Sequence, residues 1–310
     1  MNCSQYCKLF SDKESLIVSP NLIYNHLKAS TLRVVGNENY SRFLSLIKSR
    51  QIRSLKWIDK EVELIPSLVN DGESCIDVGA NYGMYTFHLS RSISAGTCYS
   101  FEPVSETHFV LSRVIKLLKL KNVKLFKIAA SNEEGEVKIN IPLTKSGIPH
   151  AGLSHLHNQS FDRKHQRQAD RYQHFKLETI KTKTLDSMIP ANEKISLIKL
   201  DIEGAELLAL QGARKILENH SPSICIELST YCLETFGITK KDVADYLLDL
   251  GYQIYKVSST QPRKLFQIQD QLSDKDHVLD SFSGNFYFLH PSKADRYQHL
   301  IQAQSERKLQ

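Results

Sequence analysis

The chain has 310 residues, of which 41% are hydrophobic and 24% are charged. This length leaves room for one large α/β domain, or for one domain with an appendage, and the composition excludes general disorder. The net charge of +6 favours anionic partners slightly. Nucleic-acid binding would need a clustered basic face, so nucleic acid is not expected as a partner.

The six cysteines include no CxxC pair. Three of them, Cys75, Cys98 and Cys225, fall inside apolar runs, where a free cysteine acts as a small hydrophobe. This pattern predicts a reducing compartment and no disulfide framework. The N-terminus lacks a basic region followed by an apolar stretch, and no apolar run reaches the roughly 20 residues of a membrane span. We therefore expect a cytoplasmic protein with no membrane span.

Residues 1–57 are predicted to form a helical extension, because stretches such as YSRFLSLIKSRQIRSLKWI carry apolar residues at helical spacing. Whether this extension is a lid or the surface of a homodimer stays open. From residue 74, short apolar runs (SCIDVG, TCYSFEP, VKLFKIAAS) alternate with helical patterns at 83–91 and 106–120. Such alternation is the signature of βαβ units and a parallel sheet.

The alternation then pauses at an extra strand, GEVKINIP, and an insertion loop at 143–176. Loops of this length are functional or disordered. LETIKTKTL is again extended, and ISLIKLD, the helix EGAELLALQGARKILEN and PSICIELS restart the parallel pattern. The helix TKKDVADYLLDLG and the strands YQIYKVS and GNFYFLH complete a domain at 58–290, and 291–310 is predicted to be a polar tail with a surface helix.

A glycine-containing loop follows the first predicted strand and comprises Asp77, Val78, Gly79, Ala80, Asn81, Tyr82 and Gly83. Glycines at a strand-to-helix turn let the backbone approach a ligand. The second strand ends at Glu102, nineteen residues after Gly83, a distance at which an acidic residue accepts hydrogen bonds from ribose hydroxyls. The two features predict an adenosine-type ligand without pyrophosphate, and the charge of Asp77 suits an ammonium or sulfonium. The alternative is a simple tight turn with Glu102 as a solvated strand end.

The motifs CIDVGANYGMYT, SFEP, TLDSM and IKLDIEGAELLALQGARKIL resemble the FkbM-type methyltransferases over residues 58–257. LDIEGAE is the most specific of these, whereas the glycine loop fits any class I methyltransferase. The resemblance implies a Rossmann-like α/β fold with a seven-stranded, mostly parallel sheet and helices on both faces. It also implies the cofactor S-adenosyl-L-methionine and the methylation of hydroxyl oxygens.

The resemblance also implies roles for individual residues. The loop after the first strand, with Asp77, Gly79, Ala80, Asn81 and Gly83, would hold the methionine part of the cofactor. Thr86 would donate to its carboxylate, Glu102 would bind the ribose, and Ala130 and Ser131 would lie near the adenine. Asp201 occupies the position that meets both cofactor and substrate.

The segment IKLDIEGAEL combines several acids with a lysine in an apolar run. Side chains alternate along a strand, which puts Lys199 and Asp201 on the same face of the predicted strand. Asp201 then lies at the mouth of the cleft, with Lys199 buried below it as the partner of one of the acids. Glu203 and Glu206 are predicted to favour a helix start, with Lys199 and Glu203 also as substrate contacts. Glu227 ends the neighbouring strand and is expected to face Asp201. These acids could orient or deprotonate a hydroxyl, hold a divalent cation or be structural, and the first of these is favoured.

The insertion loop contains His155 in the segment HAGLSHLH. Its HxH spacing can ligate zinc, but no third ligand has a suitable spacing, so no metal site is predicted. His155 remains a candidate base, with a polar lid as the alternative.

These features favour an O-methyltransferase that acts on a sugar hydroxyl in glycan, lipopolysaccharide or secondary-metabolite biosynthesis. The alternatives are a nucleic-acid methyltransferase, against which the absence of an NPPY-like tetrapeptide argues, and a non-catalytic module that keeps the cofactor fold.

Overall fold

The computed structural model describes residues 20–54, 60–143, 155–156, 174–258, 261, 263–268, 279–282 and 284–302. The chain forms two compact units, Met1–Tyr40 and Ser41–Gln310. The described part of the first unit belongs to the helix α1 (Pro20–Ser54), whose backbone leaves helical geometry at Gly36 with φ 75° and ψ 163°. The described part of residues 1–57 lies in this helix. No described helix is long and apolar enough to cross a membrane.

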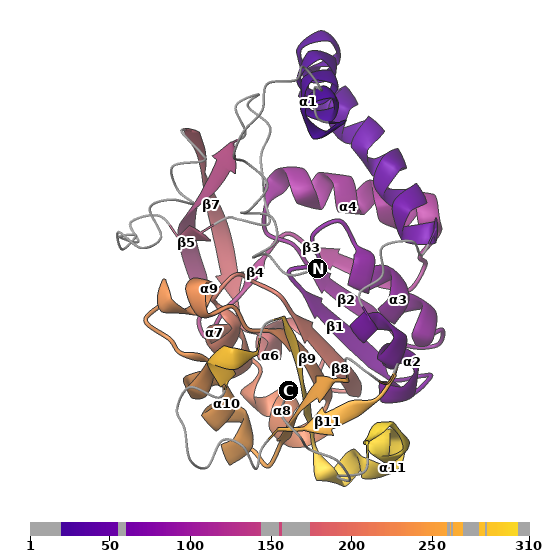
Figure 1. The fold of residues 1–310 in the computed structure, drawn as a ribbon, viewed down its shortest axis with the longest axis vertical. Coiled ribbons are helices and arrows are strands. Elements are labelled where there is room, and N and C mark those ends of the chain that lie inside the picture. Colours follow the sequence, from indigo (N-terminus) through magenta and orange to yellow (C-terminus); the bar gives the residue numbers. More distant parts are fainter. Residues whose placement is uncertain are drawn as a thin grey trace, which may run out of the picture. The chain divides into compact units, whose positions relative to one another are not determined.

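The second unit is organised around an eight-stranded sheet (Figure 1). Five strands on one side are parallel, and the three on the other side pair antiparallel. Across the sheet the order is β3 (Val123–Phe126), β2 (Cys98–Phe101), β1 (Ser74–Val78), β8 (Ile195–Leu200), β9 (Ser223–Glu227), β12 (Asn285–Leu289), β10 (Gln253–Val257) and β11 (Leu265–Gln267). The predicted α/β fold with a mostly parallel sheet is confirmed. The sheet has one strand more than expected, because β11 pairs with the edge strand β10.

Helices cover both faces of this sheet, as the two main clusters of buried side chains establish. One cluster joins the sheet to α7, α8 and α10, and the other joins it to α2, α3 and α11 (Figure 1). The α-helices of the unit are α2 (Ile65–Leu68), α3 (Met84–Ser92), α4 (Ser105–Leu118), α6 (Leu185–Met188), α7 (Glu206–Gln211), α8 (Arg214–His220), α9 (Thr230–Glu234), α10 (Lys240–Asp249) and α11 (Ala294–Tyr297). Short 3₁₀ turns are η2 (Lys60–Leu64), η5 (Leu279–Ser281), η6 (Pro291–Lys293) and η7 (Gln298–Leu300). The four cysteines in the described residues are free thiols, three of them buried.

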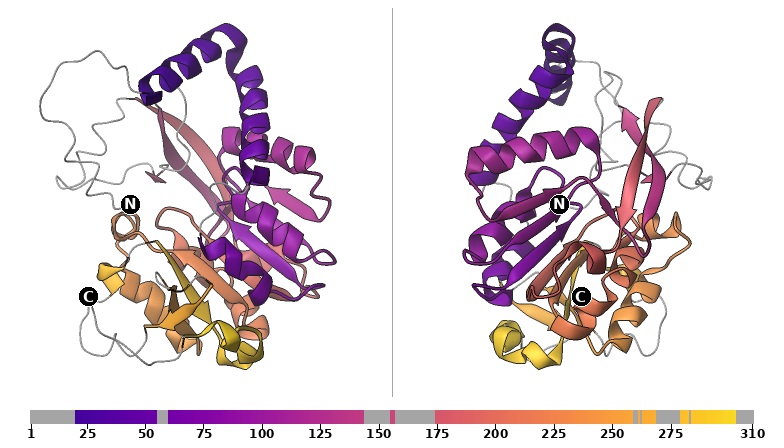
Figure 2. Two further views of the ribbon diagram at one scale, coloured as in Figure 1. Left: turned by 45° about the vertical axis from the view of Figure 1, so that its right-hand side comes forward. Right: turned by 180° about the vertical axis from the view of Figure 1, so that it is seen from behind.

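A second, smaller sheet has the strand order β4 (Ala129–Ala130), β7 (His174–Lys183), β5 (Gly135–Leu143) and β6 (His155–Leu156). The extra strand and the later extended segment of the sequence pair with each other here, because β5 and β7 form a long antiparallel ladder from Gly135–Thr182 to Leu143–His174 (Figure 2). Much of the predicted insertion loop, residues 144–154 and 157–173, lies outside the described residues. The second sheet adds the apolar side chains of Val137, Ile139 and Ile180 beside the end of β2.

Two local predictions were wrong. The single helix expected from Glu203 is two helices, α7 and α8, and the first begins at Glu206. The helix breaks at Gly212, where a Cβ would lie 1.9 Å from the carbonyl oxygen of Ser131, so the close approach of these two segments requires glycine. The tail is also not only a polar surface, because Tyr297 and Leu300 are buried in the core.

Candidate active site

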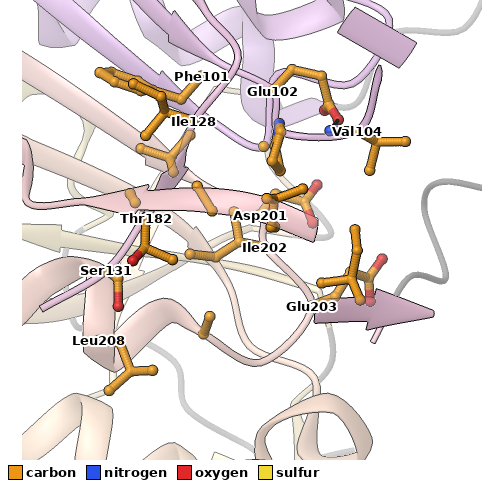
Figure 3. A pocket seen from close by; sticks show the side chains of 18 of the residues that line it. Phe101, Glu102, Val104, Ile128, Ser131, Thr182, Asp201, Ile202, Glu203 and Leu208 are labelled. Carbon is orange, nitrogen blue, oxygen red and sulfur yellow. Dashed lines mark hydrogen bonds between the residues drawn. The ribbon is translucent and has the colours of Figure 1, made fainter. Parts of the chain in front are cut away.

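The carboxyl ends of the parallel strands border a cavity of about 320 Å³. Gly79 follows β1, Glu102 follows β2 and Asp201 follows β8, and all three line this first cavity. Ser131, after β4, and Glu227, at the end of β9, line it as well. In Figure 3 the carboxylates of Glu102, Asp201 and Glu203 lie toward one side of the cavity, and Ile128 and Ser131 lie toward the other. Ligands of open α/β sheets bind at this edge, so the strand ends define a candidate active site.

The glycine loop is held against two neighbouring strands. The backbone N–H groups of Gly79 and Ala80 both donate to the carbonyl of Phe101 at 3.0 Å. Gly79 has φ 78°, and a Cβ there would lie 1.9 Å from the carbonyl oxygen of Asp201. The loop therefore needs glycine at this position, both for its left-handed conformation and for its contact with the loop after β8.

Glu102 is a buried carboxylate at the cavity wall, with 5% of its surface exposed. One carboxylate oxygen accepts a hydrogen bond from the Asn81 N–H at 2.9 Å, and the other accepts one from the Val104 N–H at 3.0 Å. Burial raises the pKa of Glu102 to about 7, although these two hydrogen bonds lower it. Each oxygen has a second lone pair, so the carboxylate keeps acceptor capacity for hydroxyl groups of a ligand.

Asp77 and Thr86 form a buried pair behind the glycine loop. The Thr86 hydroxyl donates to Asp77 Oδ2 at 2.5 Å and lies 3.1 Å from the Ser100 hydroxyl. Thr86 is fully buried and lines neither of the two cavities described here, so its hydroxyl is engaged inside the protein. Burial raises the pKa of Asp77 to about 6. The prediction that Thr86 donates to a cofactor carboxylate does not fit this geometry.

A second cavity of about 430 Å³ also borders the glycine loop. It shares Gly79, Asn81 and Asp201 with the first cavity. Asp77, Ala80 and Lys199 line the second cavity and not the first. Ala130 and Ser131 line only the first cavity, and Gly83 lines neither. The residues predicted to contact the cofactor are therefore distributed over two cavities that meet at the ends of β1 and β8.

Lys199 is fully buried in β8, below Asp201, as strand alternation predicts. Its ammonium donates to Asn285 Oδ1 at 2.6 Å and to the Leu200 carbonyl at 3.2 Å, and it lies 4.8 Å from the centre of the Tyr85 ring. The Asp201 carboxylate is 4.0 Å away. The ammonium is thus satisfied mainly by an amide, a carbonyl and an aromatic ring, and only weakly by the acid that the sequence suggested as its partner.

Glu203 and Glu206 differ from the simple helix-capping role predicted for them. Glu203 has a left-handed backbone, φ 55°, and its carboxylate accepts a hydrogen bond from the Cys232 thiol at 3.0 Å. Glu206 is buried, and one of its oxygens accepts hydrogen bonds from the N–H groups of Ile202 at 3.1 Å and Gly204 at 3.2 Å. Glu206 therefore fixes the loop that follows Asp201, and burial raises its pKa.

Asp201 and Glu227 lie side by side at the cavity. Their strands, β8 and β9, are parallel neighbours, with Leu200 opposite Ile226 in the register. Burial raises the pKa of Glu227 to about 7, and the charge of Asp201 is the next largest cause. Burial also raises the pKa of Glu203 to about 7, with a further contribution from Asp201. The site therefore contains carboxyl groups that can hold or release a proton near neutral pH.

His155 lies in β6, where its backbone pairs with Asn140 of β5, and its side chain is outside the described residues. In the described part of the chain, no group of three or more His, Cys, Asp or Glu side chains is arranged to hold a metal ion.

Sequence reasoning missed Tyr85 and Asn285, which surround the ammonium of Lys199. Asn285 precedes the apolar run of β12 and is 86 positions from Lys199, so no local pattern connects the two. It also missed Lys48 and Gln51, which bring the C-terminal part of α1 to the second cavity.

The order β3-β2-β1-β8-β9-β12-β10, with β12 antiparallel, and the glycine loop after β1 define the class I methyltransferase fold. The family model of the methyltransferase FkbM domain matches residues 77–254, more than half of the chain. The chain belongs to this family, and the predicted resemblance is confirmed.

Two curated relatives are named as methyltransferases. Methyltransferase 1 of Beauveria bassiana (strain ARSEF 2860) is 24% identical over 160 residues, which cover 50% of this chain and 64% of the relative. Methyltransferase sdnD of Sordaria araneosa is 26% identical over 153 residues, which cover 44% and 59%. Among solved structures, methyltransferase FkbM from Methylobacillus flagellatus KT matches with a TM-score of 0.44 and 16% identity, over 87% of this chain and 60% of that one. The chain spans less than two thirds of the length of each of these three proteins.

Proposed function

We propose that the protein is an S-adenosylmethionine-dependent O-methyltransferase that methylates a sugar hydroxyl. The observation that carries the proposal is the first cavity, where the glycine loop, the buried Glu102 and Asp201 meet at one edge of the sheet. Membership of the FkbM family supports the methyl-transfer chemistry. The preference for a sugar in a glycan, lipopolysaccharide or secondary-metabolite pathway follows from the resemblance noted in the sequence.

The first cavity fits the adenosine part of the cofactor. Glu102 retains free lone pairs beside the cavity and can accept hydrogen bonds from both ribose hydroxyls. Ile128, Ala130 and Leu208 provide an apolar wall for an adenine ring, with Ser131 as a polar group at the same end. Gly79 and Asn81, which border both cavities, then hold the methionine part.

When bound, S-adenosylmethionine supplies a methyl group on a positively charged sulfur. Asp201 lies at the junction of the two cavities, where it accepts a hydrogen bond from the acceptor hydroxyl and orients the oxygen. The hydroxyl proton passes to the Asp201–Glu227 pair, since the pKa of Glu227 is raised to about 7 and a base is most effective near the working pH. Lys199, beneath Asp201, adds a fixed positive charge 4.0 Å from its carboxylate.

Calorimetric titration with S-adenosylhomocysteine tests the cofactor assignment. We expect binding to the wild type and a loss of at least about tenfold in Glu102→Ala, because the two ribose hydrogen bonds go to a charged acceptor. Glu136→Ala, an exposed glutamate of β5, is the matched control and should bind like the wild type. Absence of binding to the wild type would reject the proposal.

Transfer of a radioactive methyl group from S-adenosylmethionine tests the reaction and its acceptor. We expect incorporation into saccharides and not into RNA, and a loss of about 10²- to 10⁴-fold in Asp201→Asn with unchanged cofactor affinity. Transfer into RNA would favour the nucleic-acid alternative. Full turnover by Asp201→Asn would show that Asp201 does not act as the base.

A further inference from the structure

The C-terminal part of α1, residues 41–54, packs against α4 in the second unit. Ile52 is 2% exposed and lies in one cluster with Val110 and Val114 of α4. On the same side of α1, the Ser45 hydroxyl accepts a hydrogen bond from the Arg113 side chain of α4 at 3.4 Å. One side of this part of α1 is therefore buried, and its other side is free to face solvent.

The exposed side of this segment carries both apolar and basic side chains. Phe43, Leu46, Arg50 and Arg53 follow one another at spacings of three or four residues, which puts them on one side of the helix. Phe43 is 53% exposed and Leu46 is 44% exposed, and both arginines are exposed as well. Two large hydrophobic side chains thus stand in solvent beside two guanidinium groups.

The C-terminal end of α4 has the same character. Lys116, Lys119 and Lys121 are exposed there, and Leu117 between them is 36% exposed. Of the five large hydrophobic side chains that are exposed in the described part of the chain, three lie on these two packed helices. We call this region the α1–α4 surface, and its members are Phe43, Leu46, Arg50, Arg53, Lys116, Leu117, Lys119 and Lys121.

Positive charge is also concentrated on this surface. Residues 41–54 contain four basic residues and no acidic one, and residues 107–132 contain six basic residues and no acidic one. The whole chain has a net charge of +6, so the remaining residues together carry a net negative charge. In the described part of the chain, none of the two arginines and three lysines of the α1–α4 surface forms an ion pair. The surface therefore has an excess of positive charge that the protein itself does not neutralise.

The combination of charge and apolar exposure selects the kind of partner. Phenylalanine and leucine side chains next to Lys and Arg suit the boundary between lipid head groups and acyl chains. A nucleic acid would neutralise the cations but would leave these apolar side chains in water, and single strands need a groove with aromatic side chains for base stacking. A second copy of the chain would bring like charges together. An anionic lipid bilayer satisfies both features at once.

We propose that the α1–α4 surface docks on an anionic lipid bilayer. Phe43, Leu46 and Leu117 enter the boundary between head groups and acyl chains, and the arginines and lysines bind the lipid phosphates. The protein then lies on the bilayer surface and does not span it. The inference does not depend on the reaction proposed above, because none of the residues of this surface lines either cavity.

Co-sedimentation of the full chain with lipid vesicles tests this inference. We expect binding to vesicles of phosphatidylcholine mixed with phosphatidylglycerol, weaker binding at high salt, and no binding to phosphatidylcholine alone. Arg50→Gln combined with Arg53→Gln should bind about tenfold more weakly or less, because each charge near an anionic surface contributes about fivefold. Lys116→Gln combined with Lys121→Gln should have the same effect from α4. Phe43→Ser should weaken binding about fivefold at low and high salt alike, since the loss of apolar burial is not screened.

The matched control removes two charges elsewhere. Lys194 and Lys215 are exposed lysines outside the α1–α4 surface, and their replacement together by glutamine should leave vesicle binding unchanged. All variants should keep the Tm and the S-adenosylhomocysteine affinity of the wild type, because the replaced side chains are exposed and lie outside both cavities.

Three outcomes would overturn the inference. Absence of binding to the anionic vesicles, or equal binding to both kinds of vesicle, would reject an anionic bilayer as the partner. Wild-type binding by both double variants would place the docking surface elsewhere. If a double-stranded RNA binds, the vesicles do not, and the arginine double variant weakens the RNA complex, the surface is a nucleic-acid interface. Failure of S-adenosylhomocysteine to bind would count against the proposed function and not against the docking surface.

Discussion

Replacing Glu206 tests whether a single buried carboxylate fixes the loop after Asp201. Its oxygen accepts hydrogen bonds from the N–H groups of Ile202 and Gly204, and Glu206 is 2% exposed. In Glu206→Ala both N–H groups lose their acceptor, and a buried polar group without a partner costs ~1–3 kcal/mol. The missing side chain also leaves a void, which lowers the stability further. The variant removes a buried carboxyl oxygen that has no hydrogen-bond partner, and this offsets part of the loss. The expected decrease in the free energy of unfolding is about 3 kcal/mol.

Urea denaturation and thermal unfolding measure this decrease. For a domain of this size, 3 kcal/mol corresponds to a fall in Tm of about 6–12 °C. Glu206→Gln keeps one oxygen as an acceptor and should lose only about 1 kcal/mol. Glu218→Ala is the matched control, because this exposed glutamate pairs with Arg214 one helical turn away and contributes about 0.5 kcal/mol or less. If Glu206→Ala is no less stable than Glu218→Ala, the carboxylate does not fix the loop and the reasoning is refuted.

Further predictions concern the glycine loop, the buried ammonium and the acid pair. Gly79→Ala should abolish S-adenosylhomocysteine binding in calorimetry, because its Cβ would meet the Asp201 carbonyl at 1.9 Å. Gly72→Ala, which also has a positive φ but no neighbour within 4 Å, should lose only ~1–2 kcal/mol of stability and bind normally. Lys199→Met should lower the free energy of unfolding by about 3 kcal/mol in urea titrations, since the buried oxygens of Asn285 and Leu200 lose their donor. A loss below about 0.5 kcal/mol would show that these hydrogen bonds do not stabilise the fold. The raised pKa of Glu227, about 7, stabilises the fold below the ordinary glutamate pKa, and this contribution is lost as the pH rises through 7. Between pH 5 and 8, Tm should therefore fall by a smaller amount in Glu227→Gln than in the wild type. An equal fall of Tm in both proteins would contradict the raised pKa of Glu227.

The sheet could be predicted from the sequence because its strands are short, apolar on both faces and followed by helices at regular intervals. The same reasoning located Asp201 above Lys199, since side chains alternate strictly along a strand. The small sheet was harder to predict. β5 and β7 were recognised as extended, but their pairing joins residues about 40 positions apart across the insertion, and no local pattern specifies it.

The surroundings of the acids could not be predicted for a related reason. Glu206 looked like a residue in the first turn of a helix, and the sequence does not reveal that the backbone turns back at Glu203 with a positive φ. Only this turn brings the N–H groups of Ile202 and Gly204 to the Glu206 carboxylate. The partner of Lys199 was likewise misjudged, because nearby acids are visible in the sequence whereas Asn285 is not.

The raised pKa values at the strand ends have a common physical basis. Burial raises the pKa of Asp77 to about 6 and of Glu102, Glu203 and Glu227 to about 7, and the charge of Asp201 contributes to three of the four. Ion-pair networks can also perturb pKa values, but the ammonium of Lys199 is bonded to an amide and a carbonyl and is 4.0 Å from the nearest carboxylate oxygen recorded for it. The charge of Lys199 lowers the pKa of Asp77 and of Glu227, but it does not offset burial and the repulsion between the acids. A positively charged ligand at the junction of the two cavities would relieve that repulsion and favour their ionised forms. If the protein is the methyltransferase proposed above, the same charge distribution would bind the sulfonium of the cofactor more strongly than the neutral sulfur that remains after methyl transfer.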